Sequence, residues 1–131
     1  VYHKTLNYGD CILEKRAAAA AGINEKIFIN TKGQISEGTV CNVFFVRKNM
    51  IYTPQLSCGL LPGILREYIM ERFQVTETII YPDELMYYEE CFVTNSLMGV
   101  MPVRQLGNIC FPHRAKADEV REVYEKEKMS L

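Results

Sequence analysis

The residues that could carry chemistry lie far apart in this sequence, and no familiar catalytic motif joins them. Lys4 lies in the segment HKTLNY, and a lysine with a lowered pKa is what Schiff-base chemistry requires. Glu37 lies in SEGT, ahead of an apolar stretch, where a carboxylate could keep a proton on a buried heteroaromatic nitrogen. Each has an ordinary alternative, because a single lysine is usually a surface residue and a turn glutamate is usually solvated.

A glycine at the start of a predicted helix suggests a second kind of chemistry. Gly63 directly precedes Ile64 and Leu65, and a helix N-terminus exposes unpaired N–H groups and a positive dipole end that suit a phosphate. Asn95 and Ser96 follow a short apolar strand and supply an amide and a hydroxyl that could complete such a site. Pro-Gly is also ordinary turn chemistry, and polar strand ends are common, so both interpretations stay open.

Composition excludes several classes of protein. The chain has 131 residues, of which 48% are hydrophobic and 24% charged, as in one globular domain. A net charge of -1 offers no attraction to nucleic acid or anionic lipid, so we expect neither as a partner. No apolar run approaches the roughly 18 residues that cross a bilayer. The five cysteines form no C-x-x-C pair, which favours reduced thiols, no metal site and a cytoplasmic location.

The elements that must position the candidate residues follow from local patterns. A helix is predicted over 10–21, with Asp10 as its N-cap and Gly22 just past its end. The apolar run Val43–Val46 predicts a strand buried on both faces, followed by a hairpin turn at Lys48 and Asn49. Further strands are predicted at 26–30, 34–35, 50–52, 75–80, 91–93 and 100–103, and helices at 64–73, 82–88 and 115–128. The predicted fold class is α/β, in the mixed α+β sense, in a single domain.

Taken in order, five segments resemble one known family: K-T-L-N-Y, I-S-E-G-T-V-C-N-V-F-F-V, Y-T-P, G-L-L-P-G-I-L-R-E and V-T-N-S-L-M-G-V-M-P-V. The chain is similar to the class IV pyridoxal-phosphate aminotransferases, which include branched-chain and D-amino acid aminotransferases and 4-amino-4-deoxychorismate lyase. The similarity runs from Lys4 to about Val103. It implies the fold of the D-amino acid aminotransferases, pyridoxal 5′-phosphate as cofactor, a small-molecule amine as substrate and a homodimer in the full-length protein. It also implies that residues 1–131 are the larger, C-terminal domain, without the family's smaller N-terminal domain.

The resemblance assigns a role to each candidate residue. Lys4 would be the catalytic residue, bonded to the cofactor aldehyde and then moving a proton, and Glu37 would pair with the pyridinium nitrogen. The cofactor-binding set would be Lys4, Glu37, Gly63, Ile64, Leu65, Asn95 and Ser96, the last five of them around the phosphate. Tyr8 could approach the 3-hydroxyl of the ring. Arg66, in the same helix turn, suits packing or a salt bridge as well as function.

The resemblance favours one reaction over two alternatives. T-N-S-L-M-G-V-M-P-V resembles the lyase version of this loop, whereas aminotransferases tend toward T-x-x-E-I-T-P-V. This favours conversion of 4-amino-4-deoxychorismate to 4-aminobenzoate and pyruvate, a step of folate biosynthesis. The first alternative is an aminotransferase acting on branched-chain or D-amino acids with 2-oxoglutarate. The second is a non-catalytic relative or an inactive isolated domain, against which the presence of both Lys4 and Glu37 argues.

Overall fold

The computed structural model describes residues 6–13, 25–38, 41–60, 63–95 and 99–129. Within these residues nine strands form one sheet, accompanied by two α-helices and two short 3-10 helices. The strands are β1 (Leu6–Leu13), β2 (Glu25–Ile29), β3 (Ile35–Gly38), β4 (Asn42–Arg47), β5 (Met50–Pro54), β6 (Val75–Thr78), β7 (Glu90–Asn95), β8 (Gly99–Leu106) and β9 (Ile109–Cys110). The helical elements are η1 (Leu56–Cys58), α2 (Ile64–Arg72), η2 (Pro82–Tyr87) and α3 (Ala115–Met129).

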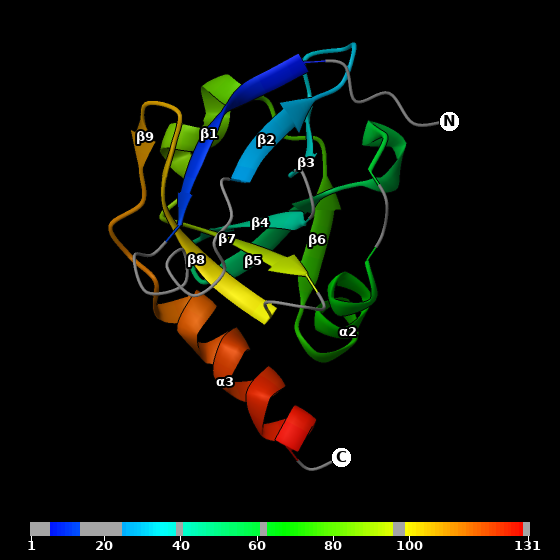
Figure 1. Ribbon diagram of the computed structural model, residues 1–131, viewed down its shortest axis with the longest axis vertical. Coiled ribbons are helices and arrows are strands. Elements are labelled where there is room, and N and C mark those ends of the chain that lie inside the picture. The colour runs from blue at the N-terminus through cyan, green and yellow to red at the C-terminus, as the bar shows by residue number, and fades with distance from the viewer. Residues whose placement is uncertain (1–5, 14–24, 39–40, 61–62, 96–98, 130–131) are drawn as a thin grey trace.

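The sheet is mixed and strongly curved. Its strand order is β3-β2-β1-β8-β7-β4-β5-β6, with β9 paired to β8. Only β5 and β6 pair in parallel, and η1 and α2 provide the crossover that a parallel pair needs. The Ile35 N–H at the start of β3 donates to the Ile80 carbonyl just beyond β6, at 2.7 Å. The two ends of the sheet therefore meet, with β1, β2 and β3 arching over β4, β5, β7 and β8 (Figure 1).

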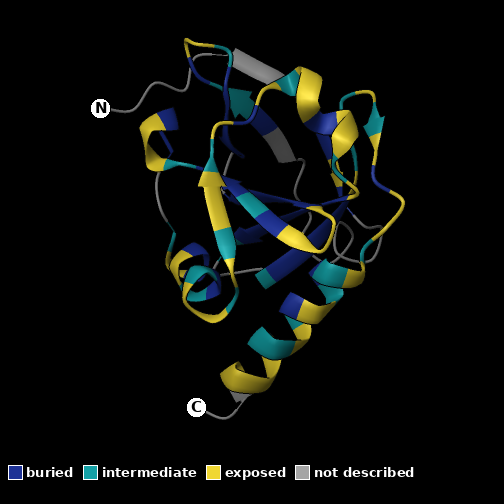
Figure 2. Cartoon of the chain, turned by 180° about the vertical axis from the view of Figure 1, so that it is seen from behind, coloured by how far each residue is buried: buried dark blue, intermediate teal, exposed yellow. Residues whose placement is uncertain are grey.

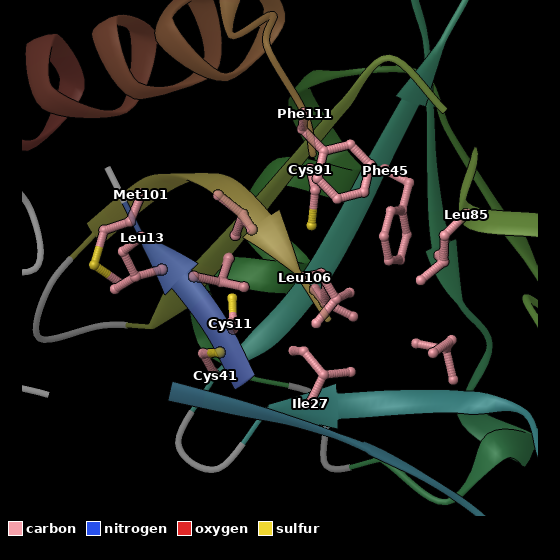
Figure 3. Close-up of a cluster of buried hydrophobic side chains, with 14 of the residues drawn as sticks. Cys11, Leu13, Ile27, Cys41, Phe45, Leu85, Cys91, Met101, Leu106 and Phe111 are labelled. Atoms are coloured by element: carbon pink, nitrogen blue, oxygen red, sulfur yellow. The ribbon is translucent and has the colours of Figure 1, made fainter. Parts of the chain in front are cut away.

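The curved sheet buries side chains on both faces. In β4, Val43 and Phe45 point to the inside of the curve, whereas Phe44 and Val46 point to the outside, as the alternation of a strand requires. The inner core, shown in Figure 3, includes Cys11, Leu13, Ile27, Cys41, Val43, Phe45, Leu85, Cys91, Val93, Met101, Leu106 and Phe111. The outer core includes Phe44, Val46, Ile51, Leu65, Ile69, Phe92, Val100, Ala117 and Val120.

Both α-helices cover the outer core. α2 contributes Leu65 and Ile69, and α3 contributes Ala117 and Val120, pairs spaced four and three residues apart so that each lies on one helix face. In Figure 1 both helices lie on the side of the sheet away from β1, β2 and β3. Figure 2 shows that the C-terminal end of α3 extends into solvent, while the central strands are buried.

The start of α3 is held by a buried carboxylate on the sheet. Glu90, the first residue of β7, accepts hydrogen bonds from the backbone N–H groups of Lys116 and Ala117, each at 3.0 Å. A carboxylate at this place satisfies two N–H groups that have no partner inside the helix, and its charge suits the positive end of the helix dipole.

Most predicted elements are confirmed, and the fold is of the predicted mixed α/β class. The strands at 26–30, 43–46, 50–52, 75–80 and 91–93 and the helices at 64–73 and 115–128 are present within one or two residues, and the strand at 100–103 is longer, from Gly99 to Leu106. The strand predicted at 34–35 begins one residue later and reaches Gly38, and the helix predicted at 82–88 is the 3-10 helix η2. Lys48 and Asn49 form the predicted turn with φ of 51° and 66°, as in a type I′ hairpin.

The helix predicted over 10–21 is wrong at its start. Residues 10–13 belong to β1, which lies between β2 and β8, while residues 14–21 and Gly22 lie outside the described residues. Cys11 and Leu13 point into the inner core, and the backbone of β1 pairs on both sides. For residues 10–13 these long-range bonds outweigh the local helix preference.

All five cysteines lie in the described residues, and none forms a disulfide. Cys11, Cys41, Cys58 and Cys91 are buried, whereas Cys110 is exposed. In the same part of the chain no group of three or more His, Cys, Asp or Glu side chains could hold a metal ion. No helix there has the length and apolar character needed to cross a membrane.

Candidate functional site

The start of α2 is fixed to the centre of the sheet by a side chain. Gly63 is the N-cap residue of α2, with φ of -77° and ψ of 161°. Its N–H donates to the Asn42 Oδ1 at 3.0 Å, and Asn42 is the buried first residue of β4. The first hydrogen bond within the helix follows at once, from the Glu67 N–H to the Gly63 carbonyl at 3.2 Å. The helix therefore begins at a defined point above β4.

The next two N–H groups of α2 have no acceptor in the described part of the chain. Ile64 and Leu65 occupy the first turn, where an α-helix provides no carbonyl for its N–H groups. The Leu65 side chain is buried in the outer core, whereas Ile64 is 80% exposed. Two backbone donors and the positive end of the helix dipole are thus available to an anion.

Only glycine fits at the N-cap position of this helix. A Cβ atom on residue 63 would lie 2.7 Å from the Asn42 Oδ1, well inside van der Waals contact. Any larger residue would have to move the helix start or break the Asn42 hydrogen bond. The close approach of helix and sheet at this point therefore depends on both Gly63 and Asn42.

A buried hydroxyl lies beside Asn42 on the neighbouring strand. Thr94 of β7 is directly opposite Asn42 of β4 in the antiparallel ladder, and directly opposite residues place their side chains next to each other on one face. Thr94 is 1% exposed, and its Oγ1 has no hydrogen-bond partner among the described residues. A buried hydroxyl of this kind needs a partner, so that a ligand at the start of α2 would find a further polar group here. Asn95 follows Thr94 at the end of β7.

A buried carboxylate lies at the same end of β4. Glu37 of β3 is 5% exposed, and the Gly38 N–H donates to the Cys41 carbonyl at 2.9 Å. This bond turns the chain from β3 directly into β4, so that Glu37 and Asn42 flank one tight connection. A buried carboxylate favours a protonated, cationic group beside it, which is the property predicted for Glu37.

The structure brings some of the predicted site residues together and leaves others undecided. Gly63, Ile64 and Leu65 form the start of α2 as predicted, but the Gly63 N–H is already bonded to Asn42. Lys4 and Ser96 lie outside the described residues, and Tyr8 is described only as part of the backbone of β1.

Arg66 is a structural residue of α2. It is buried, and its guanidinium donates to the Pro54 carbonyl at 3.1 Å and to the Glu77 carboxylate at 2.9 Å. These bonds tie the body of the helix to β5 and β6. Of the two roles left open for Arg66, the structure supports the salt bridge.

Asn42 and Thr94 were not among the residues singled out from the sequence. Both are polar residues that border an apolar strand, Asn42 directly before Val43–Val46 and Thr94 directly after Cys91–Val93. That position was the signal that drew attention to Asn95 and Ser96. Applied to both ends of every buried strand, it would have found Asn42 and Thr94 as well.

The described residues form a mixed α/β domain in which a glycine-led helix start is bonded to β4 and a buried carboxylate lies on β3. Residues 1–106 match the sequence model of the class IV aminotransferases, and the chain belongs to that family. Its members use pyridoxal 5′-phosphate as cofactor. The described residues fit this group, because two helix N–H groups, a buried hydroxyl and a buried carboxylate lie at one end of the sheet.

Known relatives and solved structures agree with this assignment. The chain is 36% identical over 90 residues to a probable branched-chain-amino-acid aminotransferase of Thermotoga maritima, covering 65% of this chain and 33% of that protein. A putative 4-amino-4-deoxychorismate lyase from Legionella pneumophila superposes with a TM-score of 0.71 at 30% identity, over 85% of this chain and 44% of the other. A putative branched-chain aminotransferase structure from Thermotoga maritima gives 0.73 at 30% identity, over 87% and 45%. The chain thus spans less than half the length of each.

Proposed function

We propose that this chain is the C-terminal, cofactor-binding domain of a pyridoxal-phosphate-dependent 4-amino-4-deoxychorismate lyase, which forms 4-aminobenzoate and pyruvate. The cofactor's phosphate binds at the start of α2, and Ser96 and Asn95 complete its site from the end of β7. Glu37 holds the proton on the ring nitrogen. Pyridoxal phosphate, when bound, draws electrons from the reacting part of the substrate.

In this proposal Lys4 is the residue that moves the proton. Lys4 would hold the cofactor through its amine and, once free, would take a proton from the substrate ring as general base and return it to the departing three-carbon group, which leaves as pyruvate. The ring becomes aromatic, which makes the step favourable. The buried position of Glu37 supports its part, because a carboxylate shielded from water keeps a neighbouring ring nitrogen protonated more strongly than an exposed one.

The observation that carries the choice of reaction is the connection from β7 to β8. Where the aminotransferase pattern T-x-x-E-I-T-P-V has its glutamate, this chain has Gly99, and where that pattern has its second threonine, it has Met101. Gly99 has a φ of 78°, which a glutamate would adopt only with strain, and Met101 is buried in the inner core. This stretch therefore lacks the acid and the second hydroxyl of the aminotransferase pattern. The likeness to the Legionella structure is a second support.

A class IV aminotransferase is the second candidate, because relatives with that name are prominent among the sequence matches. Eight curated relatives that are 28–36% identical to this chain are all named as branched-chain aminotransferases. Such an enzyme would take a branched-chain amino acid and 2-oxoglutarate in turn. A homodimer is proposed for either reaction, as in the family.

The two reactions are separated by one pair of assays on the polypeptide that contains this chain. The protein is supplied with pyridoxal phosphate and 4-amino-4-deoxychorismate, and 4-aminobenzoate and pyruvate are followed. We expect both products in equal amounts, and none with Lys4→Ala. Amino-group transfer from leucine to 2-oxoglutarate, without 4-aminobenzoate, would replace the lyase by the aminotransferase. Neither activity, with no cofactor bound, would contradict both.

A further inference from the structure

We propose that Asn42 is a positioning residue for the cofactor's phosphate. It holds the N–H of Gly63 and so leaves the N–H groups of Ile64 and Leu65 to the ligand. This inference rests on the proposed phosphate site, and it divides the glycine-led helix start into an anchor and a binding part. Gly63 then serves the site through its lack of a side chain and its bond to the sheet, rather than as a phosphate donor.

The anchor lies on a strand that is paired on both sides. β4 pairs with β5 on one side and β7 on the other, and four successive residues that follow Asn42 are buried in the two cores. The Asn42 side chain is itself buried, and its Oδ1 is 3.0 Å from the Gly63 nitrogen. Because neither strand nor side chain has room to move, the Gly63 N–H keeps one direction, and the N–H groups that follow in the helix keep theirs.

An amide suits this position better than the other polar side chains. The Asn42 oxygen accepts the N–H bond without carrying a charge. An aspartate would offer the same acceptor but would place a negative charge beside an anion-binding helix start, where like charges repel in a poorly hydrated site. An alanine would leave the partly buried Gly63 N–H without its acceptor.

The body of α2 has a separate attachment, so the effect of Asn42 is confined to the helix tip. Arg66 binds the Pro54 carbonyl and Glu77, and Leu65 and Ile69 pack in the outer core. The bonds of Arg66 and the packing of Ile69 remain when Asn42 is replaced. The backbone at Gly63, Ile64 and Leu65 can then change direction while the rest of the helix stays in place.

The test compares two ligands that differ only in the phosphate. Equilibrium dialysis measures the affinities of pyridoxal phosphate and of pyridoxal for the wild type and for Asn42→Ala. We expect the variant to bind pyridoxal phosphate about three- to tenfold more weakly, the effect of one lost hydrogen bond, and to bind pyridoxal within about twofold of the wild type. The matched control is Glu90→Ala, which removes a sheet-to-helix bond of the same kind at α3 and should leave both affinities unchanged.

A second variant, Asn42→Asp, tests the same role if Asn42→Ala fails to fold. Asn42→Asp keeps the acceptor and adds a charge, so it should weaken the binding of pyridoxal phosphate by roughly tenfold or more and the binding of pyridoxal far less. Equal losses for both ligands, or an unchanged affinity for pyridoxal phosphate in both variants, would overturn the positioning role. A wild-type protein that binds pyridoxal as tightly as pyridoxal phosphate would instead overturn the proposed phosphate site, and the inference with it.

Discussion

At the scale of single residues, the five cysteines differ in how deeply they are buried. Cys91 lies deep in the inner core, where burial, helped by the neighbouring Cys11, raises its pKa well above the usual thiol value. Burial also raises the pKa of Cys58, against the opposing effects of a backbone hydrogen bond from Gln55 and the charge of Lys32. The reactive species of a thiol is its thiolate. Buried cysteines with raised pKa values are therefore both hidden from reagents and poorly reactive.

Alkylation should therefore modify one cysteine of the native protein. We expect iodoacetamide at pH 8 to label Cys110, which is exposed, before any of the other four, and to label all five after denaturation. Mass spectrometry of the peptides gives the sites, and Cys110→Ser is the control in which native labelling should vanish. Early labelling of Cys91 would mean that the inner core opens or that the fold is different.

At the scale of elements, both helices begin at a side chain of the sheet, but with different chemistry. α3 begins at the carboxylate of the buried Glu90, which is preceded by the exposed Glu89. α2 begins at the neutral amide of Asn42. The charged cap at α3 satisfies two N–H groups, whereas the neutral one at α2 satisfies only the Gly63 N–H and adds no charge. In both places a side-chain oxygen of the sheet holds a helix start. The oxygen is charged at α3, where it stabilises the helix, and neutral at α2, where the proposed binding site lies.

The role of Glu90 predicts a loss of stability on its removal. Glu90→Ala should lower the free energy of unfolding by about 1–2 kcal/mol, since two N–H groups at a buried helix start lose their acceptor. Glu89→Ala is the matched control one residue away. It loses only an exposed bond from the Lys48 N–H and should change the stability by less than about 0.5 kcal/mol. Urea unfolding followed by circular dichroism measures both. Equal losses in the two variants would contradict a capping role for Glu90.

At the scale of the whole molecule, the two cores share strands and should unfold together. Phe45 and Phe44 are neighbours in β4 but belong to the inner and outer core. Strands β7 and β8 also carry side chains of both cores, such as Val93 and Phe92. Loss of packing on one face therefore loosens the strands that support the other face.

We expect Phe45→Leu and Phe44→Leu each to lower the stability by about 1–2 kcal/mol through a small cavity. Both variants should keep one transition in urea, with the same midpoint by tyrosine fluorescence and by circular dichroism. The control is Tyr87→Leu, on the surface of η2. Two separate midpoints in either variant would show that the cores fold independently.

Local patterns predicted most of this architecture because its central strands and helices carry strong signals. The apolar run Val43–Val46 and the spacing of Leu65 and Ile69 are visible in any short window of the sequence. The end of β1 was mistaken for a helix because its partners are distant, Leu106 pairing with Cys11 across most of the chain. Nothing in a local window contains that information.

The candidate site shows the same limit. The Pro-Gly signal placed the start of α2 correctly, since the N-cap preference is local. The bond between Asn42 and Gly63 joins residues 21 positions apart, and the pairing of Asn42 with Thr94 spans an even longer segment. Which polar residues face one another was therefore beyond the reach of sequence patterns.

The open N–H groups at the start of α2 also bear on how long the folded protein lasts. A ligand that binds only the folded state adds to its stability, by about 1.4 kcal/mol for each tenfold rise in concentration above its Kd. The helix start, left with Ile64 and Leu65 unpaired by the protein itself, thus makes the folded lifetime depend on the supply of cofactor. With the proposed site, a shortage of cofactor would lower the stability of the folded protein and raise its loss through unfolding and proteolysis.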